Sequence, residues 1–431
     1  MAPTLLCSDV FGVSPNVSSY SYVDRGDLDE EISRQLKRKT HIALRGESKC
    51  GKSWLRQKTI DDPIIVQCRL KTTHVDIYTD ILSQLGIRLI IEDATKNTIK
   101  GKVEASGGIG IKLITQLKLS LGLNIEEENT TKGQIVGHDI NDLNFIAKLI
   151  NNSNRRVVIE DFHYLSVEER KNISFDLKAL WDYQCFFVII GIWTKSNLLI
   201  HLNPDLSGRM IEIPVSWSDS DLEKVISKGS LALNINFSTN IKKQIIADAY
   251  HNVGLLQALT LAYLDEEKIY EASLGATTHL DDETKNQLAA ISYAEQLNTK
   301  YQKFATDIST GIRTRKDSTG IYAHAMAAII MADDNKLLNG FNLDEIFHIV
   351  NKRQPRIQKQ NLKTILQKLE DLQVDADGRG LVLAFNTATN DITTIDRTLL
   401  FYRKYVTITW PWEDLINEVE AQNETKIFLG D

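Results

Sequence analysis

Residues 46–53, Gly-Glu-Ser-Lys-Cys-Gly-Lys-Ser, have the types and spacing G-x-x-x-x-G-K-[ST] of a phosphate-binding loop. The two glycines let the backbone curl around an anion, which loop N–H groups and the next helix N-terminus then bind. Lys52 is expected to reach the β- and γ-phosphates of a nucleotide, and the Ser53 hydroxyl to ligate Mg²⁺. The sequence therefore predicts ATP and Mg²⁺ as ligands, and the residues expected to contact the nucleotide are Gly46, Glu47, Ser48, Lys49, Cys50, Gly51, Lys52, Ser53 and Trp54. The alternative is a chance match in a turn.

A pair of carboxylates ends the apolar run "VVIEDF" at residues 157–162. Nucleotide hydrolysis needs one carboxylate to hold Mg²⁺ through water and another to orient and activate the attacking water. By position, Glu160 is the metal-side carboxylate and Asp161 the catalytic one. The alternative is a solvated acidic strand end, which the loop about 110 residues earlier makes less favourable.

Polar residues near the ends of later apolar runs are weaker candidates. The run "GIWTKSN" places Thr194 and Asn197 where either can contact the γ-phosphate or the attacking water. Arg209 comes directly before the run "MIEIPV" and is a candidate arginine finger for a neighbouring subunit. A surface salt bridge is the alternative for this arginine.

Five short apolar segments alternate with helical patterns, which predicts a parallel sheet covered on both faces. They are residues 41–45, 63–70, 155–165, 184–193 and 210–215. Residues 95–135 interrupt the pattern with Leu117, Leu119, Leu121, Leu123 and Ile125 at spacing two, which predicts an inserted β-hairpin. An amphipathic helix over 111–121 is the weaker alternative.

The remaining sequence predicts helices and one strand pair. Three helical stretches between 320 and 374 and alternating strands over 380–405 are typical of a winged helix-turn-helix. We expect an α/β P-loop NTPase with a small helical lid and a C-terminal winged helix. The expected segments are a loosely packed lead-in (1–28), the core (29–216) with its insertion at about 95–135, the lid (217–275), a helical connector (276–318), the winged helix (319–408) and a tail (409–431).

Composition excludes several classes of protein. The 431 residues carry a formal net charge of −7, which argues against a nucleic-acid coat but leaves room for a local basic patch. The four cysteines include no C-x-x-C pair, so a disulfide framework or zinc site is not expected. The longest apolar run, residues 185–193, is about half a membrane span, and the first residues lack a signal-peptide pattern. We expect a cytoplasmic protein with no membrane contact.

The order of these motifs resembles that of AAA+ and STAND ATPases. "IEDFHYL" looks like the second motif of STAND regulators, and "AYHNVGLLQALTLAYL" (249–264) like the lid helix that closes over the base. "YVDRGDLDEEI" (22–32) resembles the block ahead of the loop, which implies that Tyr22 and Val23 lie near the adenine. The second motif here reads Glu-Asp where AAA+ proteins usually read Asp-Glu. The lid helix also lacks the AAA+ sensor arginine and the Gly-x-Pro of many STAND proteins, with His251 as a candidate substitute.

Three functions fit such an ATPase. The first is a nucleotide-controlled switch that assembles with itself or a partner protein. By analogy with the families that it resembles, such a switch would belong to a bacterial defence or regulatory system. The second is a DNA-associated ATPase that contacts duplex DNA through Arg356, Lys359 and Lys363 on the third helix of the winged domain. The third, a small-molecule kinase, leaves the C-terminal domain unexplained.

Overall fold

The computed structural model describes residues 4–95, 98–105, 108–120, 134–135, 142–193, 196–310, 319–373 and 381–417. Two compact units make up the chain. The lid and winged-helix unit contains Met1–Arg25, Glu47–Gly51 and Ser216–Asp431, and the sheet unit contains Gly26–Gly46 and Lys52–Val215. The phosphate loop is therefore divided, with Gly46, Lys52 and Ser53 in the sheet unit and Glu47–Gly51 in the other.

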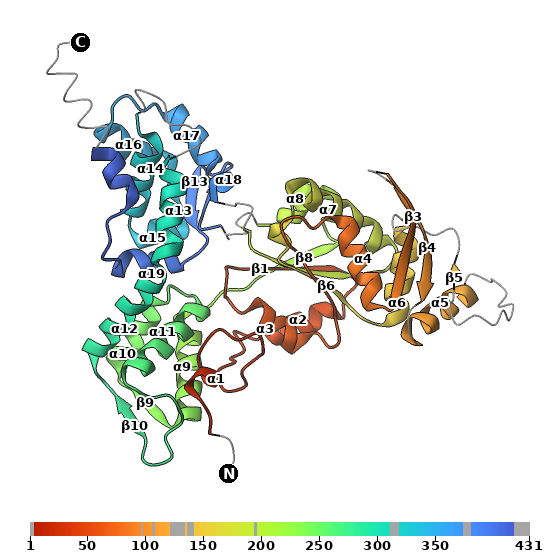
Figure 1. Cartoon of the computed structure of the whole chain (residues 1–431), viewed down its shortest axis with the longest axis horizontal. Helices are drawn as coiled ribbons and strands as arrows, with labels where there is room; N and C mark the ends of the chain where they lie inside the picture. Colours follow the sequence, from red (N-terminus) through yellow and green to blue (C-terminus); the bar gives the residue numbers. More distant parts are fainter. Residues whose placement is uncertain are drawn as a thin grey trace. The chain divides into compact units, whose positions relative to one another are not determined.

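A five-stranded parallel sheet forms the centre of the sheet unit (Figure 1). Its strand order is β2-β6-β7-β1-β8. The strands are β1 (His41–Arg45), β2 (Ile64–Gln67), β6 (Val157–Glu160), β7 (Phe187–Gly191) and β8 (Met210–Pro214). This confirms the parallel sheet predicted from the apolar segments. Because the carboxyl ends of parallel strands meet at one edge, the residues that follow β1 and β6 share that edge.

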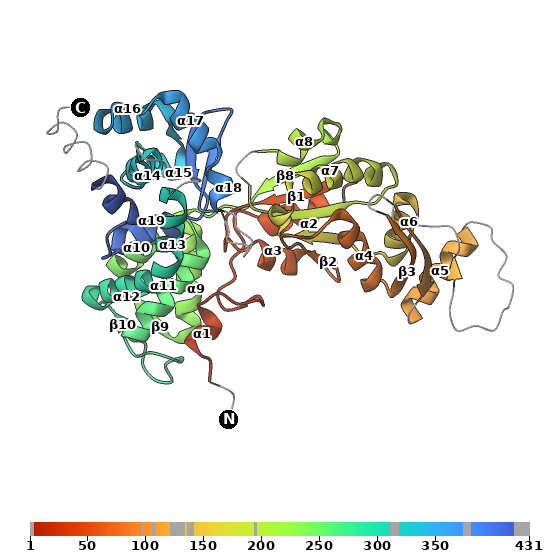
Figure 2. The same cartoon turned by 45° about the horizontal axis from the view of Figure 1, so that its top comes forward.

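Helices cover both faces of this sheet. Buried residues of β6 and β7 share one core with α4 (His74–Gln84), α6 (Leu143–Ser153) and α7 (Val167–Asp182). Helices α2 (Leu28–Leu36) and α3 (Lys52–Thr59) pack on each other, and α7 and α3 lie on opposite sides of the sheet (Figure 2). Shorter elements of this unit are η1 (Phe162–Tyr164), α8 (Leu198–Leu202) and η2 (Pro204–Leu206).

His41 is a fully buried polar residue at the start of β1. Its Nδ1 accepts the Phe187 N–H at 2.9 Å, so the ring is the tautomer whose Nε2–H donates to the Leu177 carbonyl at 2.8 Å. Burial lowers the pKa of His41 to about 4. The neutral ring therefore joins strands and helix within the core.

The insertion differs from the hairpin predicted for the alternating leucines. Its strands β3 (Ile87–Thr95), β4 (Thr98–Ala105) and β5 (Gln134–Ile135) form an antiparallel sheet, but Leu117 and Leu119 lie in helix α5 (Gly108–Ser120). Leu113 and Ile114 are buried, and with Leu117 they repeat at helical spacing. Gly110 also lets this helix approach the preceding turn, since a Cβ there would lie 2.2 Å from the Gly86 carbonyl oxygen. The helical alternative is correct up to residue 120; Leu121, Leu123 and Ile125 lie outside the described residues.

The lid consists of α9 (Asp219–Leu233), α10 (Thr239–Asp248) and α11 (Val253–Glu266), with the short parallel pair β9 (Ile235–Phe237) and β10 (Thr278–Leu280). The first residues of the chain are not the loosely packed lead-in that we expected. Helix α1 (Cys7–Val10) packs on α9 and α11, and Phe11 is fully buried. The Phe11 ring takes the space over Gly229, where a Cβ would lie 2.2 Å from the ring.

The C-terminal elements have the order of the predicted winged helix-turn-helix. Helices α14 (Ile321–Ile330), α16 (Leu343–Arg353) and α17 (Lys359–Gln367) precede a hairpin of β12 (Leu383–Asn386) and β13 (Asp391–Thr394). The buried Asp396 binds Lys300 and the Tyr301 hydroxyl, which ties this domain to the preceding helix. The other elements are α12 (Glu283–Gln296), α13 (Asn298–Thr310), α15 (Asp334–Asn339), β11 (Phe341–Asn342), α18 (Leu369–Gln373) and α19 (Thr398–Tyr405). Within the described ranges, no helix is both long enough and apolar enough to cross a bilayer.

Candidate nucleotide site

Lys52 is the first residue of α3 and lies at the carboxyl edge of the sheet. Its Nζ donates to the carbonyl oxygen of Gly46 at 3.0 Å, which links the end of the phosphate loop to its beginning. Ser53 follows it on the first turn of the helix and is exposed. The sheet unit therefore presents an ammonium and a hydroxyl at a helix N-terminus, where an anion is favoured.

Glu160 ends β6 and is already paired with a cation. Its Oε1 lies 3.1 Å from Nε of Arg56, which comes from α3, and the Glu160 side chain is 10% exposed. Sequence reasoning assigned the metal-side role to Glu160 without foreseeing this partner. The pairing with Arg56 fixes this carboxylate and reduces the negative charge that it offers to a metal ion.

Asp161 occupies the left-handed region, with φ of 54°, directly after β6. The Gln67 amide donates to its Oδ2. Burial, followed by repulsion from Glu160, raises the pKa of the Asp161 carboxyl, although Lys52 and Gln67 act in the opposite direction. The charged form of Asp161 is therefore less favourable here than in water, as expected of a group that takes up a proton.

His163 also lies at this edge. It belongs to the motif "IEDFHYL" but was not among the residues predicted to act in the site. Within the described residues, neither ring nitrogen has a hydrogen-bond partner, and the ring lies 4.3 Å from that of Tyr164. Burial, and then the charges of Lys52 and Arg170, lower its pKa to about 4, so it is a neutral imidazole at pH 7. Its position two residues after Asp161 was the signal that could have found it.

The loop residues of the other unit are held by donors from outside the loop. The Ser48 carbonyl accepts from Asn252 Nδ2 at 2.9 Å, and the Lys49 carbonyl accepts from the Gly254 N–H at 3.1 Å. The loop is thus tied to the N-terminus of lid helix α11. A carbonyl that is engaged by such a donor is not free to face an anion.

The next carbonyl, that of Cys50, accepts two hydrogen bonds. Arg25 donates from Nη1 at 2.7 Å and Trp217 from Nε1 at 2.9 Å. The Arg25 guanidinium also lies over the Trp217 ring, 4.2 Å from its centroid. Sequence reasoning missed both residues, because nothing in their local patterns points to the loop. Gly51 follows with φ of 86°, a conformation that favours glycine.

Three further residues named from the sequence, Tyr22, Val23 and His251, lie on the lid side of the molecule. Lys228 of α9 donates to the Tyr22 carbonyl at 2.7 Å, and Val23 follows it in the same segment, so both belong to the lid side of the molecule. His251 pairs with Asp219 at 3.1 Å.

The other catalytic candidates make contacts within the sheet unit. Arg209 donates to the Asp205 carbonyl, and its guanidinium lies 4.9 Å from the centroid of the Trp181 ring. The backbone N–H of Asn197 donates to Glu212 at 2.9 Å. Thr194 lies outside the described residues.

Two of the three basic residues predicted to contact DNA are exposed. Arg356 and Lys359 are exposed, and Lys359 forms an ion pair with Asp344. Lys363 lines a cavity of about 460 Å³ together with Lys359 and Asn342. The predicted DNA surface therefore carries less net positive charge than the sequence pattern indicated.

Among the described residues, no three His, Cys, Asp or Glu side chains gather into a ready-made metal site. Mg²⁺ usually keeps several waters and takes only one or two protein ligands together with phosphate oxygens. Ser53 and the two carboxylates at the end of β6, Glu160 and Asp161, are of that kind.

A solved structure that matches this chain over most of its length shows its fold. A Walker-type ATPase of Pyrococcus abyssi matches with a TM-score of 0.50 and 13% identity, over 92% of this chain and 99% of that one. The ORC1 protein of Aeropyrum pernix in complex with DNA has a TM-score of 0.39 and 9% identity, over 89% of this chain and 92% of that one. Cdc6p of Pyrobaculum aerophilum has a TM-score of 0.37 and 12% identity, over 96% and 99%. No family model matches, and neither does any curated protein. The fold is that of a Walker-type P-loop ATPase.

Proposed function

We propose that this chain binds ATP at residues 46–53, hydrolyses it, and uses the bound nucleotide to control assembly with itself or with a partner protein. The observation that carries the proposal is that Lys52 and Asp161 lie at the same edge of the sheet, close enough for the Lys52 charge to act on the pKa of the Asp161 carboxyl. A cation placed for phosphate and a carboxylate of raised pKa interact there electrostatically. These are the two charges that nucleotide hydrolysis requires.

The chemistry follows from the residues of the sheet edge. Lys52 neutralises charge on the β- and γ-phosphates, and loop N–H groups hold their oxygens. Asp161 accepts a proton from the attacking water and orients it, while Arg56 keeps Glu160 beside it. Ser53 with one of these carboxylates would hold Mg²⁺, which would supply Lewis-acid stabilisation of the phosphate charge.

The contacts of the lid support a switch. Asn252 and Gly254 bind the Ser48 and Lys49 carbonyls, so any change in the loop backbone reaches α11 directly. A ligand changes a conformational equilibrium only through contacts that differ between two states. The loop–lid contacts are of that kind, because ATP and the lid both act on the same short segment.

The test compares the wild type with Lys52→Ala and Asp161→Asn. Calorimetry should show that Lys52→Ala loses tight ATP binding, and turnover assays should show that Asp161→Asn binds ATP without hydrolysing it. Light scattering with and without ATP should show an assembly in the wild type that Lys52→Ala does not form. Equal ATP affinity for Lys52→Ala and the wild type would exclude the site. A mass that does not depend on ATP would exclude the assembly switch.

A second candidate function is duplex DNA binding, which the exposed Arg356 and Lys359 favour. Each cation that neutralises a phosphate contributes to binding that weakens as salt rises. Arg356→Ala with Lys359→Ala should cost about 2 to 4 kcal/mol of DNA affinity if both contact DNA. Asp344→Asn is the matched variant, because it releases Lys359 from its ion pair and should strengthen binding. DNA affinity that none of these changes alters would remove this candidate.

A further inference from the structure

One arginine of the winged domain reaches the phosphate loop. Arg397, which precedes α19, places Nε 2.5 Å from Oε1 of Glu47, the first variable residue of the loop. Both side chains are 22% exposed, so solvent screens the pair less than it screens a surface ion pair. Residues about 350 positions apart are thus joined by opposite charges.

The same arginine also holds the turn between lid helices α10 and α11. Its Nη1 donates to the Tyr250 carbonyl at 2.9 Å. Tyr250 and His251 have φ of 47° and 60°, the left-handed region that non-glycine residues seldom adopt. Asn252, the next residue, holds the Ser48 carbonyl. Arg397 therefore contacts the loop through Glu47 and contacts the turn that grips the loop.

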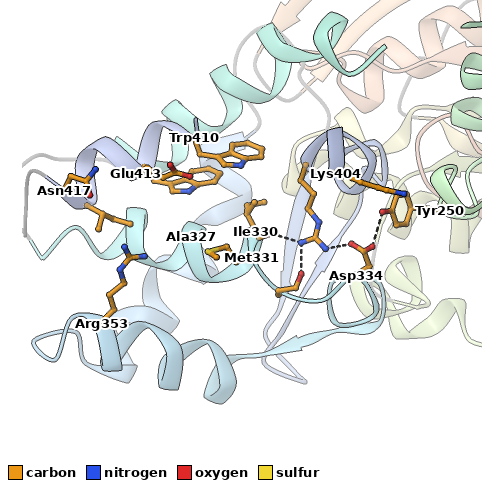
Figure 3. A pocket seen from close by; sticks show the side chains of 14 residues that line it. Tyr250, Ala327, Ile330, Met331, Asp334, Arg353, Lys404, Trp410, Glu413 and Asn417 are labelled. Carbon is orange, nitrogen blue, oxygen red and sulfur yellow. Dashed lines mark hydrogen bonds and ion pairs between the residues drawn. The ribbon is translucent and has the colours of Figure 1, made fainter. Parts of the chain in front are cut away.

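A further contact fixes this turn to the winged domain. The Tyr250 hydroxyl donates to Asp334 at 3.0 Å, and Arg403 binds the other carboxylate oxygen of Asp334. Figure 3 shows Tyr250 and Asp334 with Lys404 beside them. All three are among the residues that line a cavity of about 700 Å³. The Lys404 ammonium pairs in turn with Asp248 at the end of α10, at 2.6 Å. The turn is therefore held by Arg397 at the Tyr250 carbonyl and by Asp334 at the Tyr250 hydroxyl. Of these two residues, Arg397 also pairs with Glu47 of the loop.

We propose that Arg397 is a positioning residue that neutralises Glu47 and so makes ATP affinity depend on whether the winged domain is docked. This rests on the proposed ATP site. A carboxylate in a phosphate-binding loop repels the polyphosphate unless a cation compensates it. When the winged domain moves away, Arg397 no longer offsets the negative charge of Glu47 and the nucleotide is held less tightly. By reciprocity, bound ATP favours the docked domain to the same extent.

A double-mutant cycle on the full chain tests this, with ATP and Mg²⁺ as the probe and calorimetry as the measurement. In the wild-type background, Arg397→Gln should weaken ATP binding about tenfold, the size of a typical partly buried charge coupling. In a Glu47→Gln background, the same substitution should change affinity by less than about threefold, since no charge remains to be neutralised. Arg397→Lys, which keeps the charge but not the fork, should retain most of the affinity.

Three controls decide between outcomes. Lys352→Gln removes one exposed charge from α16 and should leave ATP affinity unchanged. Urea unfolding without nucleotide shows whether each variant is folded. Equal effects of Arg397→Gln in both backgrounds, or a loss for Arg397→Lys as large as for Arg397→Gln, would overturn the inference while the ATP site stands. If the wild type shows no ATP binding that Lys52→Ala removes, the proposed function itself fails.

Discussion

Asn252 caps lid helix α11 and anchors the phosphate loop with the same side chain. Its Oδ1 accepts from the Leu255 N–H at 3.0 Å, and its Nδ2 donates to the Ser48 carbonyl at 2.9 Å. The residue is 2% exposed, so neither bond competes with bulk water. The Asn252 amide therefore both caps the helix and helps to hold the loop.

Two substitutions at this position separate those roles. Asn252→Ser keeps an N-cap oxygen but is too short to hold Ser48, and it should lower the free energy of unfolding by about 1 to 2 kcal/mol. Asn252→Ala also removes the cap and should cost about 1 kcal/mol more. Urea unfolding followed by tryptophan fluorescence measures both. A serine variant as stable as the wild type would mean that the bond to the loop contributes nothing.

The contact between α11 and the loop also requires glycine at position 254. A Cβ at Gly254 would lie 2.5 Å from Lys49 Cβ and 2.9 Å from the Lys49 carbonyl oxygen. Gly254→Ala should push the helix and loop apart, cost about 1 to 3 kcal/mol of stability and weaken ATP binding. Gly275→Ala is the matched control, because nothing lies within 4 Å of a Cβ there. If the two variants unfold alike, the close approach is not tight in solution.

Asp161→Asn should remove turnover and at the same time stabilise the protein. Burial raises the pKa of this carboxyl, so at neutral pH the folded state carries a charge that the unfolded chain accommodates better. The stability gain of the asparagine variant should be present at pH 7 without nucleotide or metal. It should disappear as pH falls through the raised pKa toward the ordinary aspartate range, where the carboxyl is protonated in both states. Unfolding measured at several pH values shows this; a variant less stable than wild type at pH 7 contradicts it.

His41 makes stability fall in acid. Its pKa is lowered from 6.5 to about 4, so between these values the unfolded chain takes up a proton that the folded chain does not. Above pH 6.5 the residue has no effect, and its contribution is lost as pH falls toward 4, on the order of 3 kcal/mol in all. His163 titrates in the same window and should add a similar slope. His41→Gln should therefore reduce the pH dependence by about one proton, and an unchanged slope would show that His41 is not held neutral.

Local patterns predicted the elements that a few neighbouring residues determine. The octet at 46–53 predicts a strand, a loop and a helix because each glycine and the lysine have fixed places in such a turn, and β1 and α3 flank it as expected. Apolar runs such as residues 184–193 also predicted strands correctly, because a short continuous apolar run is enough to indicate a buried strand. The alternating leucines after residue 116 led to the wrong prediction of a hairpin there. Spacing two over a few residues does not exclude a helix, and the buried face of this helix includes Leu113 and Ile114.

Contacts between distant residues could not be read from such patterns. Arg56 and Glu160 are 104 residues apart, and Trp217 reaches Cys50 across 167. In the sequence, Arg56 looks like any arginine on a helix and Trp217 like any buried aromatic residue. Their significance comes from strand order, which places β7 between β1 and β6, and from the lid. Neither leaves a periodic signal.

The fit of Phe11 over Gly229 has a consequence for how this chain can change over time. A methyl group at 229 would collide with the ring, and a smaller side chain at 11 would leave a void in the lid. Relatives that carry alanine at position 229 should therefore carry a residue smaller than phenylalanine at position 11. Substitutions at these two sites should appear together in descent, although about 220 residues separate them, and neither should be tolerated alone.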